Sequence, residues 1–277
     1  MINFKKLEKN DIECINKYLL LDKTRSCEKT AGALMMWRDF YKIKWAIYDE
    51  TLIIKYDENP VSYLFPIGKN IKGVIDKIGS ATYIGVCSDN LSAFEAYNVE
   101  IMPLRDNFDY IYDAESLRTF QGKRLHSKRN FLNRFKATYQ YEFIFDGEKT
   151  DIIEFFKEID KKQPHLDETG IVELDETIDM VENRELFCLH TGEIRVNGKI
   201  ISACVGAQID DTLYVHIEKA DKDYVGSYQA IVSEFAKAFP SAQFINREDD
   251  LGEEGLRQSK LSYKPLYLLE KYIVIKH

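Results

Sequence analysis

Apolar residues recur along this chain of 277 residues with two different periods, which together predict a protein that mixes helices and strands. A period of about 3.6 residues predicts helices in the first half over residues 10–21, 30–41, 70–78 and 90–98. Alternation and short apolar runs predict strands there at INFKKL, KWAIY, TLIIKY, VSYLFPI and TYIGV.

The second half shows the same kinds of pattern. Helices are expected over residues 150–162, 174–186, 226–239 and 253–262, and strands at YQYEFIF, GEIRV, KIISACVGAQI, TLYVHIEKA, AQFINR and YLLEKYIVI. Asn197-Gly198 separates two of these strands and is the strongest short-range signal for a hairpin. Both halves therefore run through helices and strands in a similar order, although their residues do not repeat.

This order predicts an α/β (α+β) protein built from two similar domains, each a mixed, mostly antiparallel sheet flanked by helices. The expected boundaries are 1–115 for an N-terminal domain, 116–137 for a basic connecting helix and 138–277 for a C-terminal domain. Ligand sites often form between domains, so we expect the basic helix to face a crevice shared by the two.

The composition limits the possible function classes. Lysine and arginine total 38 against 46 Asp and Glu, and this net charge of -8 argues against a protein that coats nucleic acid. There is neither an apolar run of about eighteen residues nor a signal-peptide core, so we expect a cytoplasmic protein without a transmembrane segment. The five cysteines are widely spaced along the chain: Cys14, Cys27, Cys87, Cys188 and Cys204. This spacing favours reduced thiols and predicts no metal site.

One basic segment departs from the acidic average. Residues 122–136, GKRLHSKRNFLNRFK, carry six Lys and Arg and no Asp or Glu. A solvated helix face usually mixes both signs of charge, so these cations favour an external anion such as phosphate. The expected contacts come from Arg124, His126, Lys128, Arg129 and Arg134. The alternative interpretation is an ordinary helix with a solvated face and a buried apolar stripe: Leu125, Leu132, Phe135 and Tyr139.

Two segments resemble a known family. Residues 245–272, INREDDLGEEGLRQSKLSYKPLYLLEKY, and residues 124–135, RLHSKRNFLNRF, look like an uncharacterised bacterial family related to the C-terminal domain of phosphatidylglycerol lysyltransferases. The order of elements is similar to that of tandem GNAT acyltransferases, including the Fem-type transferases that take amino acids from aminoacyl-tRNA. The resemblance covers most of the chain and implies a tandem GNAT fold and an acyl or aminoacyl transferase.

The cofactor loop of GNAT enzymes is where the chain departs from that resemblance. The pattern [QR]-x-x-G-x-[GA] is approached only by residues 223–228, DYVGSY, with Gly226 and Ser227 at the start of a helix. Asp223 would repel a pyrophosphate, and Tyr228 would obstruct its approach to the backbone. We therefore expect no cofactor, and acyl-CoA is the disfavoured option.

The strand AQFI ends in Asn246-Arg247-Glu248-Asp249-Asp250, at the kind of strand end where α/β sheets bind ligands. Asn246 or Arg247 could stabilise the oxyanion of an acyl transfer. Glu248 and Asp250 could hold the ammonium groups of an amino-acid donor. The alternative is that these acids favour the start of the next helix, which explains the later acids better than Asn-Arg-Glu.

Three further segments carry titratable candidates. Alternation along TLYVHIEKA places His216 and Glu218 on one face, and Glu218 is the better candidate for a general base. Tyr263 follows the last helix, where GNAT enzymes commonly carry a tyrosine acid. His165 and Asp167 could contact substrate or begin the next helix.

The sequence is compatible with three functions. The preferred hypothesis is an acyl or aminoacyl transferase that moves an amino acid from the acceptor end of aminoacyl-tRNA to an amine or hydroxyl. The acceptor would be a small molecule, a peptide or a lipid headgroup. The alternatives are an N-acyltransferase that depends on acyl-CoA and a non-catalytic binding module on a GNAT fold. The sequence leaves the oligomeric state open.

Overall fold

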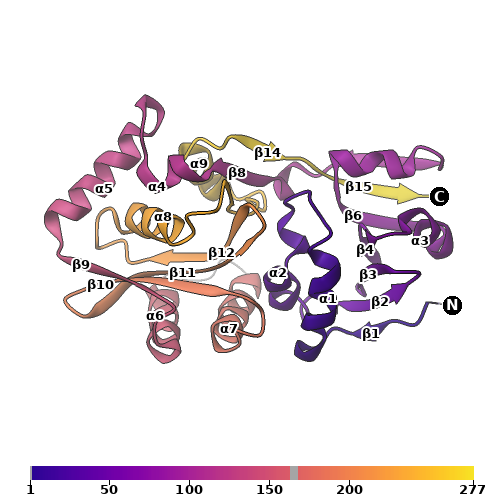
Figure 1. Cartoon of the computed structure of the whole chain (residues 1–277), viewed down its shortest axis with the longest axis horizontal. Coiled ribbons are helices and arrows are strands. Elements are labelled where there is room, and N and C mark those ends of the chain that lie inside the picture. Colours follow the sequence, from indigo (N-terminus) through magenta and orange to yellow (C-terminus); the bar gives the residue numbers. More distant parts are fainter. Residues whose placement is uncertain (1, 163–167) are drawn as a thin grey trace. The chain divides into compact units, whose positions relative to one another are not determined.

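The computed structural model describes residues 2–162 and 168–277 of the chain. It contains two compact units, each made from more than one segment (Figure 1). The first unit comprises Met1–Asp109, Asp249–Gly252 and Leu268–His277, and the second comprises Tyr110–Glu248 and Glu253–Tyr267. Among the described residues, every helix is too short or too polar to cross a bilayer.

The first unit is a mixed sheet of eight strands in the order β1-β2-β3-β4-β6-β15-β7, with β5 paired to β3. Only β4 and β6 are paired in parallel among these strands. The strands are β1 (Lys5–Lys6), β2 (Lys44–Tyr48), β3 (Thr51–Tyr56), β4 (Ser62–Leu64), β5 (Ile67–Gly68), β6 (Ala81–Cys87), β7 (Val99–Pro103) and β15 (Lys271–Lys276).

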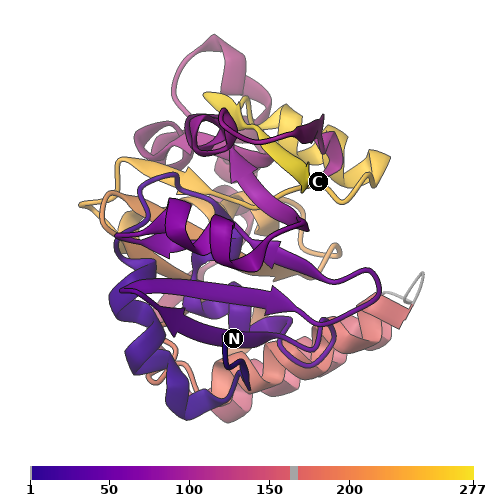
Figure 2. The ribbon, with the colours of Figure 1, turned by 90° about the vertical axis from the view of Figure 1, so that its right-hand side faces the viewer.

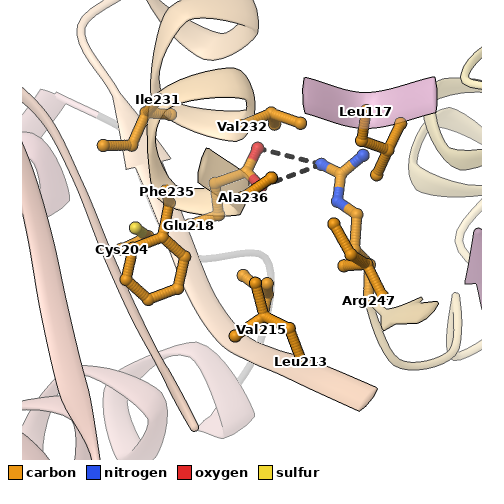
Figure 3. A pocket seen from close by; sticks show the side chains of 11 residues that line it. Leu117, Cys204, Leu213, Val215, Glu218, Ile231, Val232, Phe235, Ala236 and Arg247 are labelled. Carbon is orange, nitrogen blue, oxygen red and sulfur yellow. Dashed lines mark hydrogen bonds and ion pairs between the residues drawn. The ribbon is translucent and has the colours of Figure 1, made fainter. Parts of the chain in front are cut away.

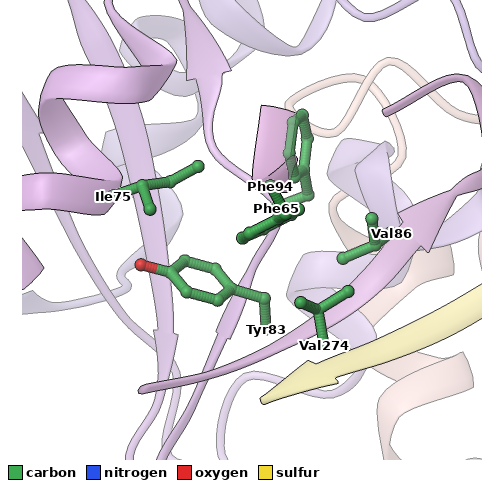
Figure 4. Packing of buried hydrophobic residues seen from close by; sticks show 6 residues of the cluster. All are labelled: Phe65, Ile75, Tyr83, Val86, Phe94 and Val274. Carbon is green, nitrogen blue, oxygen red and sulfur yellow. The ribbon is translucent and has the colours of Figure 1, made fainter. Parts of the chain in front are cut away.

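Three helices complete this unit: α1 (Ile12–Leu19), α2 (Ala31–Met36) and α3 (Ile71–Ile78). Polar side chains cap the N-termini of α2 and α3. Thr30 accepts a hydrogen bond from the Ala33 N–H, and Asn70 accepts one from the Gly73 N–H. Aromatic and branched side chains fill part of the core (Figure 4), namely Phe65, Ile75, Tyr83, Val86, Phe94 and Val274.

The second unit has a seven-stranded sheet in the order β14-β8-β13-β12-β11-β10-β9, in which β12 and β13 are parallel. In Figure 1, α8 lies on one face of this sheet, and α6 and α7 lie on the other. The strands are β8 (Asp109–Asp113), β9 (Tyr141–Phe145), β10 (His190–Val196), β11 (Lys199–Ile209), β12 (Thr212–Ala220), β13 (Phe244–Asn246) and β14 (Tyr267–Leu269). The helices are α4 (Ala114–Thr119), α5 (His126–Thr138), α6 (Lys149–Lys162), α7 (Glu168–Glu182), α8 (Ser227–Ala238) and α9 (Glu254–Ser262).

The end of the chain differs from the predicted single strand YLLEKYIVI. The segment is divided at Glu270: β14 joins the second sheet, whereas β15 pairs with β6 and β7 of the first. Figure 2 shows β15 in yellow beside the purple strands of the first unit. The prediction placed one domain before the connecting helix and one after it. In the structure, Asp249–Gly252 and Leu268–His277 belong to the first unit, although most of the second half of the chain belongs to the second.

Two other predictions about local structure need correction. Residues 90–98 were expected to form an α-helix, but Ser88–Phe94 form a 3-10 helix instead. Strands β7 and β8 lie in a stretch for which no element was predicted, and the single connecting helix expected over residues 116–137 is divided into α4, a 3-10 turn (Lys123–Leu125) and α5. In contrast, β2, β3 and β12 have the predicted bounds, and Asn197 and Gly198 both adopt positive φ (51° and 78°) at the predicted hairpin turn.

Candidate functional site

The second unit contains a gap between two parallel strands. The backbones of β12 and β13 pair only from Thr212 to Tyr214 and from Phe244 to Asn246, and β12 then continues to Ala220 without that neighbour. Side chains bridge the strands beyond this point. Arg247 follows β13 directly, and its Nη2 donates to both carboxylate oxygens of Glu218 on β12, at 2.9 and 3.0 Å (Figure 3).

This ion pair is nearly buried, with 11% of the Arg247 side chain and 12% of the Glu218 side chain exposed. Burial disfavours the charge of Arg247, but the Glu218 carboxylate outweighs it and holds the pKa of the guanidinium above its usual value. The other terminal nitrogen, Nη1, is buried and has no hydrogen-bond partner among the described residues. The pair thus fixes a guanidinium that still has an unused N–H donor.

A small cavity lies beside this guanidinium. Apart from Glu218 and Arg247, its lining comprises Leu117, Cys204, Leu213, Val215, Ile231, Val232, Phe235, Ala236 and Ile245. It leaves about 10 Å³ for the centre of a water-sized sphere, which is about enough for one water molecule. Burial raises the pKa of the Cys204 thiol well above its ordinary value, so this cysteine is a poor nucleophile.

Tyr263 brings two cations together. Its ring centre is 4.6 Å from Cζ of Arg247 and 3.9 Å from Nζ of Lys128 on α5. Gln229 of α8 donates a hydrogen bond of 2.9 Å to the Tyr263 hydroxyl. Burial raises the pKa of Tyr263 to about 12, so the hydroxyl stays protonated at neutral pH.

Lys128 is half-buried at this site. Burial and the facing charge of Arg247 lower the pKa of its amine to about 8. A substantial fraction of Lys128 is therefore neutral just above neutral pH, unlike the fraction of an ordinary lysine.

This titration can be measured. Reductive methylation with labelled formaldehyde followed by NMR should show Lys128 titrating near pH 8, because its charged form is both desolvated and close to Arg247. The exposed Lys157 on α6 provides the matched control. A Lys128 signal that titrates together with Lys157 would contradict the buried, like-charge environment described above.

His216 and Glu248 form a second pair between the same two strand ends. Nδ1 of His216 is 2.8 Å from Oε1 of Glu248, and the His216 side chain is fully buried. The predicted alternation fails here, because a register shift in the pairing of β11 and β12 leaves His216 between two paired residues. As a result, Val215 and Glu218 line the same cavity.

The segment after β13 was predicted to act as one cluster, but the structure divides it. The Asn246 side chain is buried and accepts a hydrogen bond of 2.7 Å from the Glu248 N–H, which holds the chain where Glu248 adopts a φ of 57°. Asp250 belongs to the first unit, where its carboxylate is 3.2 Å from Arg105 and accepts from the Gly252 N–H. Only Arg247 lies in the cavity.

The basic segment forms α5 and the short turn before it. Three members of the predicted stripe, Leu125, Leu132 and Phe135, are buried, whereas Tyr139 is only partly buried. Arg129 differs from its predicted role, because its Nη1 donates to the carbonyls of Phe120 and Gly122 at 2.9 and 3.1 Å. These two bonds tie Nη1 of Arg129 to the backbone that precedes α5.

Three other residues of this segment remain available. Arg124, His126 and Arg134 are exposed, and no carboxylate among the described residues pairs with either arginine. His126 is 3.4 Å from Asn130 on the next turn. The phosphate contacts expected of these two arginines therefore stay a prediction.

The start of α8 is where a GNAT cofactor loop would lie, and α5 packs against it. Gly226 has a φ of 92°, and a Cβ there would come within 2.4 Å of the Phe131 carbonyl oxygen on α5. Ser227 donates its hydroxyl to the Asp221 carbonyl at 3.0 Å. Packing and hydrogen bonding therefore explain why glycine and serine suit these two positions, without a cofactor.

Two residues at the site, Gln229 and Cys204, were not predicted from the sequence, and two predicted residues are not described by the structure. Gln229 contacts Tyr263 from a position 34 residues away, a distance at which the sequence has no periodicity to detect. Cys204 reaches the cavity from β11. His165 and Asp167 lie outside the described residues.

The first unit contains the one group of described residues with metal-ligand geometry, formed by Cys27, Glu28 and Asp109. An ammonium already lies among them: Nζ of Lys271 is 2.6 Å from Glu28 and 2.8 Å from Asp109. Burial disfavours this charge, but Asp109 and its neighbours outweigh burial and hold the pKa of Lys271 well above its usual value. We interpret the cluster as a buried structural ion pair.

Comparison with known proteins extends these observations. Residues 21–275 match the family described as phosphatidylglycerol lysyltransferase, C-terminal. A conserved protein of unknown function from Bacteroides thetaiotaomicron has a similar crystal structure, with 33% identity, a TM-score of 0.93 and full coverage of both chains. The structure of L-PGS from Bacillus licheniformis is 12% identical, with a TM-score of 0.65 over 95% of this chain and 91% of that one.

Two further structures identify the fold. FemX is 8% identical with a TM-score of 0.63, and it covers 100% of this chain and 98% of its own. A tandem GNAT protein from the clavulanic acid biosynthesis pathway is 8% identical, with a TM-score of 0.52 and the same coverage. The predicted tandem GNAT fold is confirmed.

Proposed function

Because the chain belongs to the family of phosphatidylglycerol lysyltransferase C-terminal domains, we propose that it transfers an aminoacyl group, with lysyl as the first candidate, from aminoacyl-tRNA to an amine or hydroxyl. The observation that carries the proposal is the state of Arg247. Glu218 fixes its Nη2, while Nη1 is buried and has no partner in the part of the chain that the structure describes. A preorganised donor of this kind suits an oxygen on which negative charge develops.

Transfer of an aminoacyl group needs such a donor. The acceptor oxygen or nitrogen attacks the ester carbonyl of the donor, whose oxygen becomes an oxyanion, and the bond to the terminal ribose of the tRNA then breaks. Nη1 of Arg247 would donate to that oxygen in a site from which water is largely excluded. Since the cavity has room for about one water molecule, the donor must enter as side chains around Arg247 move apart.

The Tyr263 hydroxyl supports the same reaction. It accepts a hydrogen bond from Gln229 and keeps its own proton, because its pKa is raised to about 12. A protonated hydroxyl beside Arg247 can donate to the departing ribose oxygen. Glu218 serves in this proposal to hold Arg247, since both of its oxygens accept from the same nitrogen.

The donor would be bound through its phosphates. Arg124 and Arg134 project from the segment around α5 and lack carboxylate partners among the described residues. Because tRNA carries its charge on the backbone, such arginines would position the acceptor end without reading its sequence. The proposal implies a cytoplasmic protein, because aminoacyl-tRNA is found in that compartment.

The packing at the start of α8 favours this donor over acyl-CoA. Pyrophosphate binding uses open N–H groups at a helix N-terminus, but here the Phe131 carbonyl lies against Gly226. Asp223 in the preceding loop adds a negative charge where a pyrophosphate would need a cation.

The experiment uses the full chain with radiolabelled lysyl-tRNA and vesicles that contain phosphatidylglycerol, because the family name points to that acceptor first. We expect label to leave the tRNA faster with protein than without it and to appear in the lipid fraction. Small amines replace the vesicles in a parallel reaction. Binding of lysyl-tRNA without any consumption would favour a binding module, and turnover of acetyl-CoA alone would favour an N-acyltransferase.

Donor binding should weaken steeply as salt rises. Arg124→Ala with Arg134→Ala removes two phosphate contacts, so the slope of log affinity against log salt should become shallower by about 1.5. Lys157→Ala with Lys161→Ala removes two exposed charges from α6 and should leave the slope unchanged. Equal effects of the two double variants, measured by filter binding, would show that α5 is not the tRNA contact.

A further inference from the structure

Lys128 lacks the partner that a partly buried lysine usually has. Its Nζ lies 3.9 Å from the centre of the Tyr263 ring. Neither a hydrogen bond nor an ion pair joins it to any residue in the described parts of the chain. Burying an unpaired ammonium is unfavourable, so stabilisation of the fold does not account for a lysine at this position.

The charges that face Lys128 make its environment positive. Arg247 lies over the same tyrosine ring and Lys264 follows α9, so two cations act on the amine, while Glu218 opposes them. Glu218 already gives both oxygens to Arg247. Burial and Arg247 consequently lower the pKa of Lys128 to about 8, which leaves a usable fraction of neutral amine near neutral pH.

The position of Lys128 is held by tight helix packing. Arg129 ties the start of α5 to the carbonyls of Phe120 and Gly122. Further along, the Phe131 carbonyl approaches Gly226 so closely that no side chain fits between them. Lys128 therefore lies on a helix that is held in place by packing. A group that reacts with substrate needs such a fixed position.

The proposed transfer still lacks a base. The acceptor must lose a proton when it attacks, Glu218 is occupied by Arg247, and Tyr263 is protonated. We propose that Nζ of Lys128 takes this proton and is the general base of the transfer. The inference rests on the proposed function and adds a residue to its site.

The lone pair of neutral Nζ takes the proton of the acceptor hydroxyl or amine while the acceptor forms its new bond to the aminoacyl carbonyl carbon. The carbon–oxygen bond to the terminal ribose breaks, and the ribose oxygen receives one proton from Tyr263 or from the new ammonium of Lys128. If Tyr263 donates, the ammonium returns a proton to it, so the enzyme ends unchanged.

Lys128→Arg separates a base from a simple cation, because arginine keeps the charge but has no lone pair to accept a proton at working pH. We expect Lys128→Arg to bind lysyl-tRNA as the wild type does and to consume it about 10²–10⁴ times more slowly in single turnover with phosphatidylglycerol vesicles. Lys128→Met should be equally slow. The wild-type rate should rise with pH around pH 8, and this rise should be missing from both variants.

A second measurement keeps the result independent of folding. Lys128→Cys treated with 2-bromoethylamine regains an amine at this position and should recover most of the lost rate, with treated wild type as the reference for the native cysteines. Lys157→Arg on α6 is the matched control and should behave as wild type. A Lys128→Arg variant with the wild-type rate, or no recovery on aminoethylation, would overturn the assignment of Lys128 alone. Failure of the wild-type protein to consume lysyl-tRNA would remove the proposed function as well.

Discussion

Arg247→Met should slow aminoacyl transfer strongly and also destabilise the second unit. The variant loses the donor to the oxyanion, which costs about 10²–10³ in rate. It also leaves the Glu218 carboxylate buried without its cation, which costs about 3–5 kcal/mol of unfolding free energy. Urea denaturation and single-turnover consumption of lysyl-tRNA measure the two losses separately.

A double variant separates stability from activity. Arg247→Met with Glu218→Leu replaces the whole buried pair by apolar side chains in a cavity that is largely apolar, so most of the lost stability should return. Activity should remain lost, because no N–H donor is restored. Recovery of transfer in the double variant would show that Arg247 serves only the fold.

Lys271→Met should have the largest effect on the first unit. It leaves Asp109 fully buried and Glu28 nearby without the ammonium that lies 2.8 and 2.6 Å from them. We expect a loss of about 3–5 kcal/mol at neutral pH. The exposed Lys72 on α3 is the matched control, and Lys72→Met should change stability by less than about 0.5 kcal/mol.

The pH dependence of this cluster has a definite sign. Burial raises the pKa of Glu28, but Lys271, together with hydrogen bonds from Ser26 and the backbone, outweighs burial, so the folded pKa lies below the ordinary value of 4.5. Its contribution is therefore present above about pH 4.5 and is lost as the pH falls through the folded pKa. In Lys271→Met the unpaired acids gain stability by protonation, so the gap from wild type should narrow as the pH falls. A gap that widens in acid would contradict the role given to Lys271.

The sequence predicted local elements well where apolar pattern and turn residues agree. Strands β2 and β3 have the expected bounds because the turn between them falls at Asp49-Glu50, both of which adopt positive φ. The segment YLLEKYIVI shows the limit of such reasoning. Its alternation is that of one strand, but the strands with which each part pairs lie far away in the sequence, and pairing divides it at Glu270.

The sequence identified several residues that lie together at the site, but it did not predict how they interact. Arg247, Glu218, Tyr263 and Lys128 were each singled out as separate candidates, and the structure places them together in the second unit. Their roles depend on how β12 and β13 separate, which no spacing reveals. Asp250 shows the converse, since it follows Arg247 closely in sequence but belongs to the other unit.

The most direct measurement is a structure of the full chain bound to a non-hydrolysable lysyl-amide analogue of the tRNA acceptor end. We expect Nη1 of Arg247, which has no partner among the described residues, to donate a hydrogen bond to the lysyl carbonyl oxygen while Nη2 stays on Glu218. An analogue bound at another place, with Nη1 still unpaired, would contradict this expectation.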